Sequence, residues 1–157
     1  MENWLEFIEQ HFKNELPFAK FMDATLLHIA HGQAKIKIPL KPEYANTYGT
    51  THGGIAAALV DMVSGVALRT LKLRIATVEI STSYFEPVEL NEELIAEAQL
   101  VRQGSNLLYA DVNIFKNENI LVARGKTIHF IRGEETTEQC ANIGAVTKQP
   151  RPENKTC

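Results

Sequence analysis

The sequence predicts an α+β domain in which one antiparallel sheet of five to six strands curls around a single long helix. Residues 53–70, near the middle of the chain, are apolar on nearly every side of a helix, and such a helix has to be enclosed. Segments in which apolar and polar residues alternate come before and after it, and no second long helix follows. This order of elements is typical of a sheet that wraps one helix.

The N-terminal segment, residues 1–22, is expected to be helical and to pack on the rest of the domain. Apolar side chains recur at helical spacing within residues 2–13: Trp4, Leu5, Phe7, Ile8 and Phe12. This spacing is typical of a short amphipathic helix. Pro17 has no backbone N–H to donate to a helical hydrogen bond, so it is expected to end the helix.

Alternating patterns predict the strands. Residues 23–30 and 33–40 form an expected hairpin that turns at His31 and Gly32. Four more strands are expected after the helix, at residues 74–86, 93–103, 106–116 and 119–131. On the last strand small residues share one face, which would let the sheet approach the helix closely: Ala123, Gly125 and Thr127.

Length and composition indicate one domain followed by a tail. A chain of 157 residues that is 45% apolar can bury one core of ordinary size, and we assign residues 1–132 to it. Residues 133–157 are polar without apolar periodicity, so a flexible tail is expected. Cys140 and Cys157 both lie in this tail and cannot bridge the core, which favours a reducing, cytoplasmic setting.

Charge and hydropathy argue against several classes of function. A net charge of −3 and a pI near 6.0 are atypical of a nucleic-acid binder. The most apolar stretch, residues 53–68, carries Asp61 in its middle, whereas a membrane span needs about 20 uncharged residues. The N-terminus lacks the pattern of a signal peptide, and no metal-binding motif is present. We expect no membrane span, no metal and no cofactor.

Asp61 is the first candidate for a catalytic group. It interrupts an otherwise apolar helix, and a carboxylate buried without partners is costly. Such carboxylates favour functional sites, although a structural ion pair or an exposed stripe of the helix would also account for it.

The start of the same helix is the second candidate. Gly53 and Gly54 open it, and the first N–H groups of a helix have no intrahelical acceptor and carry the positive end of its dipole. They could stabilise a carbonyl oxygen that gains charge, or the glycines could simply serve the turn. Eight residues separate Gly53 from Asp61, about 12 Å of helix. A site that uses both residues is therefore expected to need a second subunit with an antiparallel helix.

Other polar residues carry weaker signals. His52 precedes the helix and fits a capping or loop role better than that of a catalytic base. Ser64 lies in mid-helix without the glycine of a nucleophile elbow, so it is expected to be a small core residue. The remaining histidines have no ligand-like spacing: His11, His28, His31 and His129.

The run from Asn46 to Asp61 resembles the signature of the PaaI-like, or phenylacetate-type, acyl-CoA thioesterases of the hotdog superfamily. Asn46, His52, Gly53 and Asp61 match it in residue type and spacing together. Residues 77–87 also resemble the strand that follows the helix in that family.

This resemblance covers about residues 20–131 and implies the hotdog fold, a curled antiparallel sheet around a central helix. It also implies a homodimer, commonly a homotetramer, that hydrolyses acyl-CoA to a carboxylic acid and CoA. Coenzyme A is then part of the substrate and not a cofactor.

The resemblance further implies a role for each matched residue. Gly53 N–H would polarise the thioester carbonyl, and Asp61 of the partner chain would act as nucleophile or as general base for water. Asn46 would position substrate or water, His52 would order the helix start, and Thr77 would assist the water.

Substrate-binding residues are assigned with the same resemblance in view. Gly54 and Asn46 are expected at the substrate, and Arg124 and Lys126 at the phosphates of CoA. Arg124 and Lys126 are chosen from these available cations: Arg69, Lys72, Arg74, Arg102, Arg124, Lys126 and Arg132.

Two other functions remain open at this point. Hotdog hydratases and dehydratases pair a histidine with an acidic residue in a different motif, and no H-F-P-x-x-P-like run occurs here. A non-catalytic acyl-CoA-binding protein would keep the fold and lose the chemistry, and the presence of Asp61 with Gly53 speaks against it. Aromatic and medium-chain acyl groups are both compatible with the sequence.

Overall fold

The computed structural model describes residues 2–117 and 119–138. Helices α1 (Glu2–Glu15) and α2 (Pro17–Phe21) precede the hairpin of β1 (Thr25–Ala30) and β2 (Gln33–Pro39). A 3-10 turn, η1 (Pro42–Tyr44), leads to the long helix α3 (Gly53–Arg69). The strands that follow are β3 (Leu73–Tyr84), β4 (Glu93–Gln103), β5 (Leu107–Lys116) and β6 (Ile120–Glu134). Each expected strand and the long helix are present, with bounds that differ from the expected ones by at most three residues.

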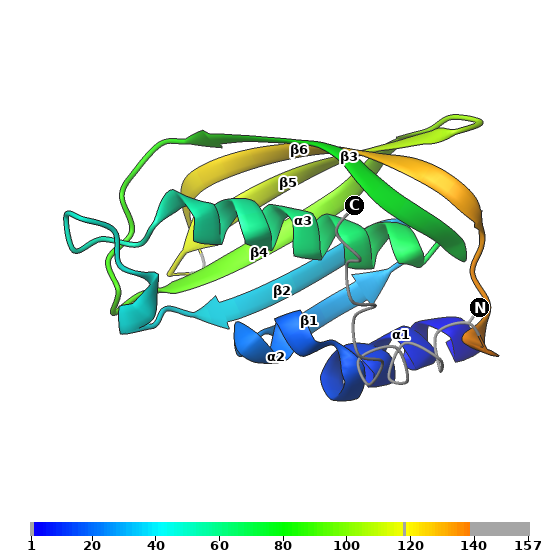
Figure 1. Cartoon of the computed structure of the whole chain (residues 1–157), viewed down its shortest axis with the longest axis horizontal. Coiled ribbons are helices and arrows are strands. Elements are labelled where there is room, and N and C mark those ends of the chain that lie inside the picture. Colours follow the sequence, from blue (N-terminus) through cyan, green and yellow to red (C-terminus); the bar gives the residue numbers. More distant parts are fainter. Residues whose placement is uncertain (1, 118, 139–157) are drawn as a thin grey trace, which may run out of the picture.

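The six strands form one antiparallel sheet in the order β1-β2-β4-β5-β6-β3. In Figure 1 this sheet curls around α3, which lies along its concave side. Strand β3 directly follows α3 in the chain, yet it pairs with β6 at the edge of the sheet. The expected architecture, a curled antiparallel sheet around one central helix with a helical N-terminal segment, is confirmed.

The alternation along the strands supplies the core. One face of β2, β4 and β5 is buried, with these side chains: Ala34, Ile36, Ile38, Leu94, Ala96, Ala98, Leu108, Ala110, Val112 and Ile114. Helix α3 packs Leu59, Val60 and Val63 against that face. Apolar burial of this kind contributes about 25 cal/mol per Å² and is the main force that holds α3 in the sheet.

Gly125 of β6 confirms that small residues bring the sheet close to the helix. A Cβ atom at this position would lie 2.5 Å from Cγ1 of Val60, which is far inside van der Waals contact. No larger residue fits here without moving α3.

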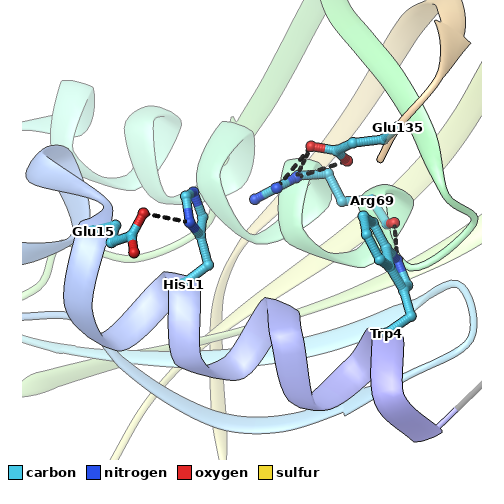
Figure 2. Close-up of polar contacts among 5 residues, drawn as sticks. All are labelled: Trp4, His11, Glu15, Arg69 and Glu135. Atoms are coloured by element: carbon cyan, nitrogen blue, oxygen red, sulfur yellow. Dashed lines mark hydrogen bonds and ion pairs between the residues drawn. The ribbon is translucent and has the colours of Figure 1, made fainter. Parts of the chain in front are cut away.

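The N-terminal segment is anchored to the end of α3. Trp4, Ile8 and Phe12 of α1 join the main core, and Nε1–H of Trp4 donates to the carbonyl oxygen of Arg69 at 3.0 Å (Figure 2). The first helix ends at Glu15, just before Pro17, as expected. Pro17 then opens the short helix α2, because its fixed φ angle suits the first position of a helix.

The last strand is longer than expected, and the residue that follows it is tied to α3. Strand β6 continues to Glu134, and the Glu135 carboxylate accepts hydrogen bonds from Nε and Nη2 of Arg69, the latter at 2.7 Å (Figure 2). Arg69 at the C-terminus of α3 thus fixes the chain just after the sheet ends. The rest of the expected tail, residues 139–157, lies outside the described residues.

Candidate active site

A cavity of about 330 Å³ opens at the N-terminus of α3. His52 is the N-cap of the helix, and its Nδ1 accepts a hydrogen bond from Gly54 N–H at 2.9 Å. The expected capping geometry of His52 is confirmed, and it occupies the Gly54 donor. Gly53 stands at the first helical position, where the backbone N–H has no intrahelical acceptor. The donor that faces this cavity is therefore Gly53 N–H.

Tyr84 explains why the helix starts with a residue that lacks a side chain. Its phenol donates to the Gly53 carbonyl oxygen at 2.7 Å, and burial raises the pKa of Tyr84, which keeps the donor protonated. A Cβ at Gly53 would come within 3.3 Å of the Tyr84 ring. The tyrosine and the absent Cβ together leave the Gly53 backbone accessible to a ligand.

Asn46 holds the loop that precedes the helix. Its Oδ1 accepts from the backbone N–H groups of Tyr48, at 2.9 Å, and Thr50, at 3.2 Å, while its Nδ2 donates to Thr50 Oγ1 at 2.8 Å. Asn46 also lines the cavity at the helix start. The geometry shows an asparagine that orders the loop at the edge of this cavity.

Asp61 lies two turns further along α3, in a different cavity. This second cavity also measures about 330 Å³ and contains Asp61, Thr77 and His129. The Thr77 hydroxyl donates to Oδ1 of Asp61 at 2.7 Å, so the aspartate and the threonine expected to act together are in contact. Asp61 is partly exposed in the single chain, contrary to the expectation of a buried carboxylate, because it sits on the flank of α3 that the sheet does not cover.

Behind Thr77 lies His129, which the sequence reasoning left without a role. Its Nδ1 is 3.4 Å from Thr77 Oγ1, and its Nε2 is 3.1 Å from Thr127 Oγ1. Thr77 Oγ1 gives its proton to Asp61 and can only accept from Nδ1. Ser64 Oγ gives its proton to the Asp61 carbonyl oxygen and can only accept from Nε2, at 3.3 Å. Burial lowers the pKa of His129, opposed in part by the charge of Asp61. A neutral histidine therefore lies behind the hydroxyl that holds the Asp61 carboxylate.

The alternation of inward and outward side chains along β6 indicates that His129 points inward. The inner face recognised at Gly125 and Thr127 continues two residues on to His129, and the register pairs His129 with Thr77 across β3 and β6. That pairing depends on β3 reaching the far edge of the sheet, which no local pattern specifies.

A single chain does not bring Gly53 and Asp61 together. They lie eight residues apart along α3 and line separate cavities, about 12 Å apart along the helix axis. A third hollow runs between them along the uncovered flank of α3, lined by Ala57, Ala58 and Tyr84 among others. The two halves of the expected site thus share one open surface.

Arg124 and Lys126 lie on the opposite face of the sheet. They alternate with the inward-facing Gly125 and Thr127, and Arg124 Nε–H donates to Oδ1 of Asn113 on that outer face at 3.0 Å. Within one chain the sheet separates both cations from Gly53 and Asp61. No group of three or more His, Cys, Asp and Glu side chains in the described part of the chain is arranged to hold a metal ion.

Comparisons with known proteins agree with this geometry. The profile of the Thioesterase superfamily matches residues 48–123, a range that contains Gly53, Asp61 and Thr77. Acyl-coenzyme A thioesterase 13 of Homo sapiens is 30% identical over 105 residues, which are 65% of this chain and 75% of that protein. The chain belongs to the Thioesterase superfamily.

Further relatives extend the likeness over most of the chain. A putative esterase of Saccharolobus solfataricus, SSO2140, is 29% identical over 114 residues, which are 71% of this chain and 81% of that protein. Among solved structures, the E. coli PaaI protein superposes with a TM-score of 0.77 at 19% identity, covering 85% of this chain and 99% of that one. A hypothetical thioesterase of Streptococcus pneumoniae, solved with coenzyme A, gives a TM-score of 0.71 at 25% identity and covers 74% and 94%. The expected PaaI-like hotdog fold is confirmed.

Proposed function

We propose that this protein is an acyl-CoA thioesterase that works as a homodimer, with Gly53 of one chain and Asp61 of the other in each site. The observation that carries the proposal is the Asp61–Thr77 hydrogen bond of 2.7 Å on the same open flank of α3 as the helix start. Membership of the Thioesterase superfamily, relatives named acyl-CoA thioesterase and a structural neighbour with bound CoA support the reaction and the substrate.

The edge of the sheet supports a dimer. Strand β3 pairs with β6 on one side and has no neighbour on the other among the strands of the described residues. Apolar side chains on and next to it are exposed, with Val78 at 58% and Phe85 at 53%. An exposed apolar edge strand is a surface for pairing with another chain. Two copies joined at β3 by a two-fold axis would place their α3 helices antiparallel and side by side; a tetramer of two such dimers is part of the same proposal.

The chemistry follows from the two halves. Gly53 N–H, at the positive end of α3, stabilises the carbonyl oxygen as negative charge develops on it. The partner's carboxylate at position 61, held by Thr77, either removes a proton from the attacking water or attacks the carbonyl carbon itself. In the first case the tetrahedral intermediate expels the CoA thiolate, which takes that proton back. In the second, the C–S bond breaks, the CoA thiolate leaves and a mixed anhydride with Asp61 forms. Water then hydrolyses the anhydride, which frees the carboxylic acid and the Asp61 carboxylate and supplies the proton that the thiolate takes up. Neither route needs a serine nucleophile, because a thioester is already activated.

The remaining assignments are also proposals. Asn46 and Gly54 border the substrate, and Arg124 and Lys126 can meet CoA phosphates only if another subunit or a long CoA path brings them to the same site. None of the described helices has the length and apolar character to cross a membrane. A cytoplasmic location is proposed from the cysteine usage.

Thiol release from a panel of acyl-CoAs tests the proposal, with acyl groups from acetyl to palmitoyl, phenylacetyl and hydroxybenzoyl. Asp61→Asn is expected to lower kcat by about a hundredfold or more, roughly 2.7 kcal/mol of barrier. Asp111→Asn, a matched change at an exposed residue on the outer face of β5, is expected to leave kcat as it is. If no thioester is cleaved, or if Asp61→Asn works as well as the native protein, a binding protein or a hydratase becomes the better description.

A further inference from the structure

The cavity beside Asp61 extends beneath the N-terminal helices. On one side it is lined by Met62 and Val66 of α3 and by Ile75 of β3. On the other side it is closed by the junction of α1 and α2, with Leu16 and Phe18. Apart from Asp61, Thr77, His129 and Arg69, the side chains around it are apolar. The reacting carboxylate of the proposed site therefore stands at the mouth of an apolar space.

The wall contributed by the N-terminal segment is a fixed part of the domain. Ala19 and Met22 next to the junction are buried in the main core. At the other end of the segment, the hydrogen bond from Trp4 to the carbonyl oxygen of Arg69 ties α1 to α3. A wall held at both ends can define the depth of a pocket.

The size of the cavity suits a particular class of acyl group. An engineered apolar cavity of about 150 Å³ in another protein holds a benzene molecule. A cavity of about 330 Å³ has room for an aryl ring with a short linker, or for an aliphatic chain of about eight carbons. Its apolar lining disfavours acyl groups that end in a charge.

Leu16, Arg69 and Ile75 separate this cavity from a second one, because they line both. The guanidinium of Arg69 is held in place by Glu135 (Figure 2). His11 lines the cavity beyond, and its buried Nε2 has no hydrogen-bond partner among the described residues. An apolar chain that passed Leu16 would meet these polar groups, so the pocket ends at Leu16.

We propose that this cavity binds the acyl group of the substrate, an uncharged aryl or medium-chain acyl group, and that the α1–α2 junction sets its maximum length. The proposal rests on the proposed thioesterase function: the carbonyl lies at Gly53 of one chain and the acyl group enters the pocket of the chain that supplies Asp61. Gly65 forms part of the floor, where a Cβ atom would meet no heavy atom within 4 Å. A larger side chain at Gly65 shortens the pocket, and a smaller one at Leu16 lengthens it.

Two substitutions with opposite predicted effects test the pocket. Binding is measured by calorimetry with S-(2-oxoalkyl)-CoA analogues of acetyl to myristoyl length, in which a methylene between sulfur and carbonyl prevents hydrolysis. Gly65→Leu, which also improves helix propensity, is expected to weaken the octanoyl-length analogue about tenfold more than the acetyl-length one. Leu16→Ala is expected to shift the tightest-binding length upward by about two carbons or more. Leu27→Ala, an exposed leucine of β1 outside both cavities, is the matched control and keeps the native length preference.

The same series of hydrolysable acyl-CoAs separates the two proposals. If thioesters are cleaved and both variants keep the native length preference in binding and hydrolysis, the pocket assignment is overturned and the thioesterase function stands. If the length preference in binding shifts in opposite directions but no thiol is released, the pocket is supported and the hydrolysis is overturned.

Discussion

The two halves of the proposed site are held by different kinds of contact. At the helix start, His52 and Asn46 make their side-chain hydrogen bonds to residues at most four positions away. At the acidic half, Thr77 reaches back 16 residues to Asp61, and His129 lies 52 residues from Thr77. The first half is built by a loop, and the second by the meeting of a helix with two strands of the sheet.

This difference indicates how each half responds to change. The side-chain hydrogen bonds of His52 and Asn46 can form locally, so these two residues act on the stability and direction of one loop, whereas Tyr84 reaches Gly53 from 31 residues away. The acidic half exists only when β3 has paired with β6, so its residues can be altered without disturbing any local turn. Substitutions in the acidic half therefore report on chemistry more directly than those at the helix start.

The largest effect is expected when two variants are mixed, one defective at the helix start and the other at the carboxylate of the proposed site. Gly53→Val crowds Tyr84 and the carbonyl site, and Asp61→Asn removes the carboxylate, so each homodimer is expected to lose about a hundredfold of kcat or more. After the two are mixed and re-associated, half of the dimers contain one intact site, and about a quarter of the native rate should return. Thiol release and mass measurement of the mixed dimers check this.

The mixing experiment has a built-in control. A mixture of Asp61→Asn chains with native chains has to retain about half of the native rate, because each site uses one carboxylate. No recovery in the doubly mixed sample, with mixed dimers present, would show that each site lies within one chain.

Loss of the Thr77 hydroxyl is expected to have the next largest effect. Thr77→Val keeps the shape and removes the donor to Asp61, so kcat should fall by roughly tenfold to a hundredfold. Thr77→Ser keeps the hydroxyl and is expected to retain most of the rate. Equal loss in both variants would point to packing, and not the hydrogen bond, as the contribution of this residue.

His129 is expected to make the folded chain sensitive to acid. Its pKa is lowered from 6.5 by burial, so the unfolded chain takes up the proton first as the pH falls through 6.5, and the free energy of unfolding decreases. At pH 5.5 relative to pH 7.5, the native protein should lose about 2–4 °C more of its Tm than His129→Gln does, which is roughly 1 kcal/mol.

His28→Gln serves as the control for this titration, because His28 is exposed on β1. Its Tm is expected to fall with pH as steeply as that of the native protein. The assignment fails if His129→Gln and the native protein show the same slope of Tm against pH.

The smallest expected effect is at the helix start. His52→Ala removes the N-cap of α3 and should cost about 1 kcal/mol in urea unfolding, whereas His52→Asn keeps a side-chain acceptor and should cost less. A loss of several kcal/mol would mean that this half is not as local as its hydrogen bonds indicate.

Much of the fold could be predicted because each strand carries its own pattern. Ala34 to Ile38 on β2 and Leu108 to Ile114 on β5 alternate in burial as the sequence alternates in polarity, and the period of a strand is two. The short helix α2 and the late end of β6 were not predicted. A proline that ends one helix can also begin another, and Glu135 is held by Arg69 from far away in the chain.

The residues around Asp61 show where sequence reasoning stops. The helix start was read correctly at His52 because a cap is a contact between near neighbours. The partial exposure of Asp61, the contact of His129 with Thr77 and the outer-face position of Arg124 could not be predicted, because each depends on which face of the curled sheet meets which flank of α3.

The sequence by itself determined the order of elements, the apolar central helix, the cap at His52 and the motif that joins Asn46 to Asp61. The tertiary structure decided that Thr77 and His129 stand behind Asp61, that Arg124 and Lys126 lie on the outer face, and that the N-terminal helices close a pocket. The physical reason is the distance along the sequence over which each kind of interaction acts. Helix periodicity, strand alternation and capping act over a few residues, whereas the site is assembled by strand pairing and core packing between distant segments, as for Thr77 and His129, which lie 52 residues apart.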